Sequence, residues 1–140
     1  MMFMNGVLGG LVGITAGADL MLPTSSIIIG FISGPVVFLS SSLLEKAELD
    51  DPVGAIPVHL FCGIWGTLAV GIFGSLASFD QFMIQLACVG ITGVFCIVAG
   101  TIIVQLVKAV KGLRVTEEAE EAGLDISEHD GSFCLLYTSD

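Results

Sequence analysis

His59 is the residue whose type and position most directly suggest chemistry, because it is the only readily ionisable side chain within a long apolar run. It follows Asp50, Asp51 and Pro52, and at a helical rise of 1.5 Å per residue it lies about 12 Å beyond Asp51. That depth is near the middle of a hydrocarbon layer about 30 Å thick. A polar side chain there is expected to face a cavity or a partner, and a neutral imidazole can both donate and accept a hydrogen bond.

Pro57 makes the backbone next to this histidine irregular. It has no N–H to donate to the Val53 carbonyl, so a backbone acceptor is freed close to His59. Irregular backbone at membrane depth is tolerated where it is buried in protein or lines a cavity. Two interpretations therefore stay open: a structural histidine hydrogen-bonded to a neighbouring helix, or a polar group that lines a pathway.

Metal binding and enzyme chemistry are weaker interpretations of the same residue. His59 and Cys62 form an H-x-x-C pair that one helix face would carry, but a metal site needs two more ligands. Buried cysteine usually behaves as a small hydrophobe. No companion nucleophile or metal cluster accompanies His59, so we expect no enzyme activity, no metal and no cofactor.

The composition places these residues in a membrane. The 140 residues are 54% hydrophobic and 13% charged, with a mean hydropathy of +0.97, whereas soluble domains carry about 25% charge. Most of the net charge of −10 belongs to an acidic stretch near the C-terminus. Only four residues are Lys or Arg, which argues against a nucleic-acid partner. The composition also excludes a disordered chain and a disulfide-stapled secreted module.

The long uncharged runs predict an all-α integral membrane fold with four transmembrane helices, because a spanning helix needs about 20 mostly apolar residues. The third run would start with Asp51 as its N-cap and Pro52 at its first helical position, with Asp50 and Asp51 near the positive end of the helix dipole. The spans are expected near residues 3–21, 24–44, 52–76 and 80–107, which gives a membrane domain over residues 1–107 and an acidic tail over residues 108–131.

Basic residues predict the direction of these spans. If the four spans alternate, all four basic residues fall on one face, and the other connections carry none. That face is expected to be cytoplasmic, together with the C-terminus. The residues concerned are Lys46, Lys108, Lys111 and Arg114.

Small residues recur on the predicted spans, often at four-residue spacing. They let helix backbones approach where lipid supplies no hydrophobic drive. Gly63 and Gly66 of the third span are therefore expected at helix contacts. Plain helix packing and a narrow pathway lined by bare backbone both remain open, because the glycines do not separate them.

Three segments, in the right order, resemble the ammonium transporter (Amt/Mep/Rh) family. Residues 50–73 read DDPVGAIPVHLFCGIWGTLAVGIF, and residues 5–17 read NGVLGGLVGITAG. The tail segments GLRVTEE and EAGLDISEH, at residues 112–118 and 121–129, look like the family's cytosolic C-terminus. The resemblance covers roughly residues 4–130. Residues 132–140 match nothing in that tail and are expected to be non-native sequence.

The resemblance implies a homotrimer with about eleven spans and one pore per subunit, transporting ammonium or ammonia across the plasma or inner membrane of the cell. The chain matches the last four spans, so we expect a C-terminal fragment in which Met1 need not be the native start. His59 matches the second of two facing pore histidines, and the first lies in a span that this chain does not include. The alternative is a small four-span structural or assembly subunit without transport of its own.

The resemblance also implies a regulatory role for the tail. It would pack under the neighbouring subunit, couple the pores and respond to a PII-family nitrogen-signalling protein. Arg114 and Asp125 lie in the matching segments, and Gly123 would supply a bend. Ser127 is a candidate phosphorylation site whose added negative charge would repel an acidic partner. On composition alone, a charged solubilising tail remains open.

Overall fold

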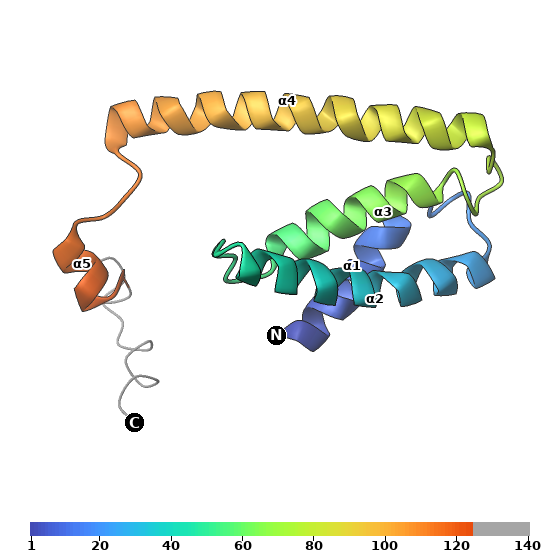
Figure 1. Ribbon diagram of the computed structural model, residues 1–140, viewed down its shortest axis with the longest axis horizontal. Coiled ribbons are helices and arrows are strands. Elements are labelled where there is room, and N and C mark those ends of the chain that lie inside the picture. Colours follow the sequence, from blue (N-terminus) through green and yellow to red (C-terminus); the bar gives the residue numbers. More distant parts are fainter. Residues whose placement is uncertain (125–140) are drawn as a thin grey trace. The chain divides into compact units, whose positions relative to one another are not determined.

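The computed structural model describes residues 1–124, which form helices and turns without any strand (Figure 1). The chain divides into two compact units, Met1–Val94 and a second that begins at Phe95, and each is described by itself. The elements in chain order are α1 (Met2–Thr15), α2 (Pro23–Lys46), the π-helix η1 (Ile56–Phe61), α3 (Cys62–Ala69), α4 (Phe79–Lys111) and α5 (Glu117–Ala122).

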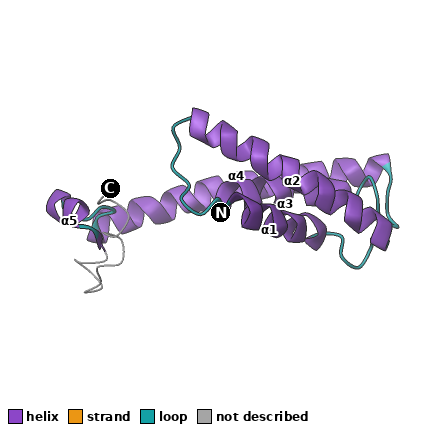
Figure 2. Ribbon diagram, turned by 90° about the horizontal axis from the view of Figure 1, so that it is seen from below, coloured by secondary structure: helices purple, strands orange, loops and turns teal. Residues whose placement is uncertain are grey.

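In the first unit, helices α1, α2 and the continuous pair η1–α3 pack against one another (Figure 2). One face of α2 supplies much of the core, through buried residues spaced three or four apart, as helical periodicity requires. These residues are Ile29, Ser33, Val37, Ser40 and Leu44. Val37 meets Val58 of η1 and Cys62 of α3 in a small apolar cluster. The Trp65 indole N–H donates to the Ile29 carbonyl over 3.2 Å and ties α3 to α2.

The two buried serines of α2 satisfy their hydroxyls within their own helix. Ser33 Oγ donates to the Ile29 carbonyl at 2.9 Å, and Ser40 Oγ lies 2.6 Å from the Val36 carbonyl. A buried hydroxyl without a partner would be costly. Because each hydroxyl bonds to a carbonyl of its own helix, that cost is avoided. The small serine side chains also allow close contact between α2 and the glycines of α1.

Two of the described helices are long and apolar enough to cross a membrane. Helix α2 has 24 residues and α4 has 33, which correspond to about 36 and 50 Å. The other two apolar helices, α1 and η1–α3, are shorter. Helix α1 has 14 residues, or about 21 Å, less than a hydrocarbon layer of about 30 Å.

Helix α1 ends before the expected limit of the span over residues 3–21. Its last residue, Thr15, turns its hydroxyl back to the Leu11 carbonyl at 2.8 Å. The chain then continues as turns, in which the Leu20 N–H donates to the Gly17 carbonyl. Pro23 opens α2 at its first turn, because its fixed φ suits a helix start and its missing N–H is not needed there.

Helix α3 likewise ends at Ala69, although the span was expected to continue to residue 76. Tertiary contacts take the chain out of the helix. The Ser75 N–H donates to the Leu20 carbonyl at 3.0 Å, and the Ser78 N–H donates to the Gly71 carbonyl at 3.1 Å. A Cβ on Gly71 would lie 2.5 Å from Phe82 Cα, so only glycine permits this approach of the turn to α4.

The second unit holds the end of α4, the short helix α5 and the chain between them. Gly112 follows α4 with a φ of +77°, a left-handed conformation that suits a helix C-terminus. Thr116 caps α5 by accepting a hydrogen bond from the Ala119 N–H at 3.3 Å. Arg114 and Glu120 form an exposed ion pair at 3.2 Å.

Candidate functional site

The π-helix η1 carries His59 on its open side. Pro57 and Val58 of the same turn are buried beneath α1 and α2, whereas His59 and its neighbour Leu60 are exposed. The imidazole forms no hydrogen bond or ion pair with any residue from 1 to 124. No described helix therefore bonds this histidine, and both ring nitrogens are available to a group outside residues 1–124.

The turn from Ile56 to Phe61 is π-helical. Pro57 lies in the first turn after Gly54, where N–H groups have no helical acceptor, so its missing N–H removes no helical hydrogen bond and the expectation that it does was wrong. At its end, the Cys62 N–H donates to the Pro57 carbonyl, five residues earlier, as in a π-helix. Such single wide turns are frequent at functional sites.

The wide turn also separates His59 from Cys62. The sequence spacing placed the two on one helix face, which holds for an α-helix but not for a turn closed by bonds between residues five apart. Cys62 is buried, and its thiol lies 3.7 Å from the Ser33 carbonyl, whereas His59 is exposed. Among the described residues no group of three or more His, Cys, Asp or Glu is arranged to hold a metal ion.

The Val53 carbonyl lies in the turn before the helix and accepts a hydrogen bond from another helix. Asn5 Nδ2 of α1 donates to it at 3.1 Å, across 48 positions of the sequence. Asn5 is 9% exposed whereas Val53 is exposed, so the bond is partly shielded from water. The irregular backbone before His59 is thus held by a buried side chain of α1.

Asp51 bonds the free backbone N–H groups at the start of the same helix. Its Oδ1 accepts a hydrogen bond from the Ala55 N–H at 2.9 Å, and its Oδ2 accepts one from the Ile56 N–H at 2.8 Å. These are first-turn donors that would otherwise lack a partner. Pro52 was expected at the first helical position, but it lies in a turn ahead of the helix, because the chain reverses at Gly54 with a φ of +73°. Asp50 is exposed beside this turn.

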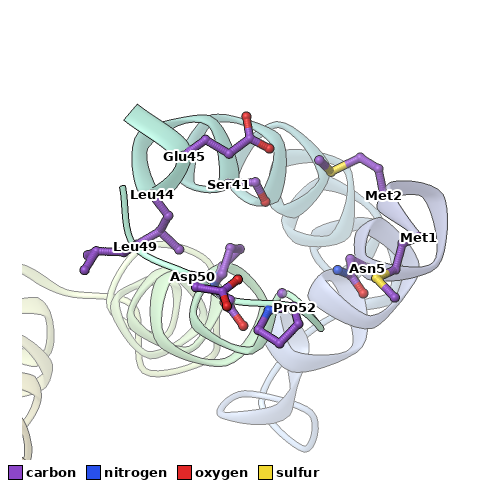
Figure 3. Close-up of a pocket in the computed structure, with 12 residues that line it drawn as sticks. Met1, Met2, Asn5, Ser41, Leu44, Glu45, Leu49, Asp50 and Pro52 are labelled. Atoms are coloured by element: carbon purple, nitrogen blue, oxygen red, sulfur yellow. The ribbon is translucent and has the colours of Figure 1, made fainter. Parts of the chain in front are cut away.

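A cavity of about 310 Å³ opens at this end of the helices (Figure 3). Asn5 of α1, Ser41 and Glu45 near the end of α2, and Asp50 and Pro52 of the following loop are labelled around it. Glu45, Asp50 and Asp51 all line the cavity, so it has a negative potential that favours cations. The carboxylates lie before the π-turn in sequence, and His59 is not among the lining residues.

The two glycines expected at helix contacts behave differently. A Cβ on Gly66 would collide with the Gly13 carbonyl of α1, so backbone meets backbone there. Gly63 has open space within 4 Å of the position where its Cβ would lie. Contacts within this chain therefore explain Gly66 but not Gly63, which lies on the open side of the helix.

The tail residues lie apart from this site in sequence and are described within their own unit. Arg114 pairs with Glu120, and Gly123 ends α5 with a φ of +89°, a conformation that L side chains rarely adopt. The expected roles of Asp125 and Ser127, and the expected non-native sequence at 132–140, concern positions outside the described residues.

Sequence reasoning missed Asn5 as a part of this site, although a signal was present. It is the only asparagine in the sequence and lies in an apolar run. An amide there needs a partner. The cavity-lining role of Ser41 and Glu45 carried no such signal, because it depends on how the loop after α2 folds back.

Comparison with known proteins identifies relatives of this chain. The model of the Ammonium Transporter Family matches residues 1–133. The chain is 42% identical over 130 residues to ammonium transporter Amt2 of Methanocaldococcus jannaschii, covering 89% of this chain and 31% of the relative. It is 40% identical over 126 residues to a putative ammonium transporter of Synechocystis, covering 90% of this chain and 28% of the relative.

A third relative, ammonium transporter Amt2 of Archaeoglobus fulgidus, is 37% identical over 142 residues, covering 89% of this chain and 30% of the relative. The chain thus spans about a third of the length of these curated relatives. The relatives are named as transporters and not as enzymes, which fits the long apolar helices of a membrane protein. With a family match that covers nearly all of its residues, this chain belongs to the Ammonium Transporter Family.

Proposed function

We propose that this chain takes part in the transport of ammonium or ammonia across a membrane, with His59 as one of the imidazoles that line the pore. The observation that carries the proposal is an exposed imidazole, without a bond to any residue from 1 to 124, on a π-turn within an apolar segment of a member of this family. Left in contact with lipid, such a group would be unsatisfied. A polar pathway completed by segments outside this chain would satisfy it.

The chemistry of the cargo favours imidazole at this depth. Ammonium does not cross hydrocarbon cheaply as a cation, and a wholly apolar lining would leave its N–H groups without acceptors. A carboxylate would hold the cation too tightly. A neutral imidazole accepts an N–H through one nitrogen and donates through the other, so it can accommodate ammonia and transfer a proton without a fixed charge.

The complete transporter is proposed to have about eleven spans, of which this chain supplies the last four, and to assemble as a trimer in the cell membrane with a cytoplasmic C-terminus. The fraction of the relatives' length that the chain covers supports the first point. The basic residues after α4 support the cytoplasmic placement. The tail from Arg114 to Ser127 is proposed to contact a PII-family regulator.

Methylammonium uptake tests the transport function. The reading frame that includes this chain is expressed in cells without their own ammonium carriers, as wild type, His59→Ala and His59→Glu. We expect uptake by the wild type, loss of most uptake with alanine, and altered selectivity with glutamate, because a fixed carboxylate retains cations.

His129→Ala is the matched control, since it removes the other histidine of the sequence, in the tail. Uptake and selectivity unchanged in both His59 variants would exclude the pore role. If the wild-type protein reaches the membrane but gives no uptake, the alternative of a structural or assembly subunit is favoured instead.

A further inference from the structure

We infer that Thr67 is a second polar contact on the transport pathway, with its hydroxyl oxygen accepting an N–H of ammonium or methylammonium. This role rests on the proposed function, because it extends the pathway from His59 along the same helix. Two features of η1–α3 carry it: the register of Thr67 with His59, and a hydroxyl that is bonded to no residue from 1 to 124.

Two parallel lines of residues run along η1–α3, one buried and one open. The buried line, with a spacing of four residues, consists of Val58, Cys62 and Gly66. The open line consists of the residue after each of these, namely His59, Gly63 and Thr67. In the π-turn, where bonds join residues five apart, four residues make nearly one full turn. In α3 four residues advance about 40° beyond a full turn, at about 100° per residue. The open line therefore stays on one flank of the helix.

The open line leaves room between the imidazole and the hydroxyl. A Cβ on Gly63 would have nothing within 4 Å. Thr67 follows His59 by about 12 Å at 1.5 Å per residue, close to the end of α3 at Ala69. A cargo that moves along this flank would meet the hydroxyl near the helix end and the imidazole deeper, with bare backbone between them.

The Thr67 hydroxyl differs from three other hydroxyls of the first unit. Thr15, Ser33 and Ser40 each direct the hydroxyl to the carbonyl four residues earlier. The Gly63 carbonyl has the same spacing from Thr67, yet the Thr67 hydroxyl bonds neither it nor any other group of residues 1–124. Its oxygen is not buried, so it is open to a partner outside the described residues.

The chemistry of a hydroxyl suits this cargo. Facing lipid, a threonine would avoid the cost of an unbonded hydroxyl by bonding the carbonyl of its own helix. A hydroxyl oxygen has two lone pairs and no charge, so it accepts an N–H without holding a cation as a carboxylate does. The Thr67 hydroxyl and the His59 imidazole thus offer the cargo two neutral acceptors along one flank.

Methylammonium uptake by the complete reading frame, in cells without their own ammonium carriers, tests the hydroxyl. Thr67→Val removes the hydroxyl at equal size, and Thr67→Ser keeps it. We expect Thr67→Val to raise the KM about tenfold, as the loss of one hydrogen bond to a charged group predicts. The maximal rate per transporter in the membrane should stay within about twofold, and Thr67→Ser should restore the KM.

Thr92→Val is the matched control, because it removes a hydroxyl from another apolar helix and should leave the KM unchanged. An unchanged KM in Thr67→Val, or equal KM values for Thr67→Val and Thr67→Ser, would overturn the inference. A lower amount of transporter in the membrane with an unchanged KM would assign Thr67 to packing and overturn it as well. If Thr67→Val does not reach the membrane, Thr67→Ala replaces it.

Thiol labelling tests the direction of position 67 without transport. In a cysteine-free version of the same reading frame, Thr67→Cys should react with 2-aminoethyl methanethiosulfonate, a small cationic reagent. Ammonium chloride should slow the reaction, and choline chloride should not. Leu68→Cys lies at the same depth but about 100° around the helix, and should react much more slowly.

Equal reaction rates at positions 67 and 68, or no effect of ammonium at position 67, would overturn the inference. The outcomes separate it from the proposed pore role. If His59→Ala abolishes uptake while Thr67→Val leaves the KM unchanged, only the inference fails. If neither His59 variant affects uptake or selectivity, the pore role itself fails.

Discussion

Single atoms decide how closely the helices of the first unit approach. At Gly66, the position of the missing Cβ is taken by the Gly13 carbonyl of α1. At Gly63, one turn earlier on the same helix, nothing lies within 4 Å. In lipid there is no hydrophobic driving force between helices, so close backbone contacts of this kind stabilise their association instead.

This contrast predicts a difference between two alanine variants. Gly66→Ala should lower the free energy of unfolding by about 1–3 kcal/mol, because the methyl group forces α3 away from α1. Gly63→Ala should be neutral or raise it by up to about 1 kcal/mol, through helix propensity alone. Reversible unfolding of the purified chain in micelles measures both. Equal effects of the two substitutions would contradict the packing described for Gly66.

At the same scale, local rules predict some of the site but not all of it. The missing N–H of Pro57 follows from its ring, but the expected freed carbonyl at Val53 was wrong, because the helix begins after Gly54 and Val53 lies in the preceding turn. The hydrogen bond from Asn5 to Val53 could not be predicted either, because Asn5 is 48 positions away and reaches Val53 only after α1 has packed on η1.

Among the elements, α4 is the helix with the longest apolar stretch. It is 33 residues long, its most apolar stretch has a mean hydropathy of 2.4, and none of that stretch is buried among the described residues. Its length of about 50 Å exceeds the hydrocarbon thickness of about 30 Å, so a tilt or a protruding end is required. The basic residues Lys108 and Lys111 lie in its last turn, where water or headgroups would receive them.

Two native thiols report on whether α4 crosses the bilayer. Cys88 and Cys96 are free and exposed, and by helical rise they lie about 12 and 24 Å beyond Asp80. In inside-out membrane vesicles of a Cys134→Ser chain, both should resist a membrane-impermeant maleimide and react with a permeant one. Lys111→Cys is the positive control, expected to react with both reagents. Rapid labelling of Cys88 and Cys96 by the impermeant reagent would contradict a spanning α4.

The sequence predicted helices in the right regions but not where two of them end. Hydrophobic runs extend to residues 21 and 76, whereas α1 ends at Thr15 and η1–α3 ends at Ala69. Hydropathy measures the solvent that a segment prefers, and glycines and cross-chain hydrogen bonds determine where its helix stops. The Ser75 to Leu20 bond joins the two turns that follow these helices, and no local pattern specifies it.

For the molecule as a whole, charge predicts which side of the membrane each connection occupies. Lys46 ends α2 and is followed by the acidic loop, whereas the turn after α1 carries Asp19 and no basic residue. By the positive-inside rule we expect the Lys46 side in the cytoplasm. The cavity near Glu45, Asp50 and Asp51 is then expected on that side, because those residues lie at the same helix end.

Labelling of single cysteines in intact cells tests this topology. In a reading frame in which Cys134 is serine, Asp19→Cys should react with an impermeant maleimide from outside. Ala47→Cys should react only after the membrane is permeabilised. Both positions are exposed in the structure, so a missing signal is not explained by burial. Labelling of both positions from the same side would mean that α2 does not cross the bilayer.

The wide turn at η1 has a consequence for natural and engineered variation in length. In an ordinary helix each residue advances the direction of the side chains by about 100°. Deleting one residue between Ile56 and Phe61 would remove the extra position of the π-turn and swing the ring of His59 around the helix, with the histidine itself retained. Homologues with a one-residue gap in this segment would therefore keep the histidine but change the direction of its side chain. An alignment that counts only identities would not reveal that difference.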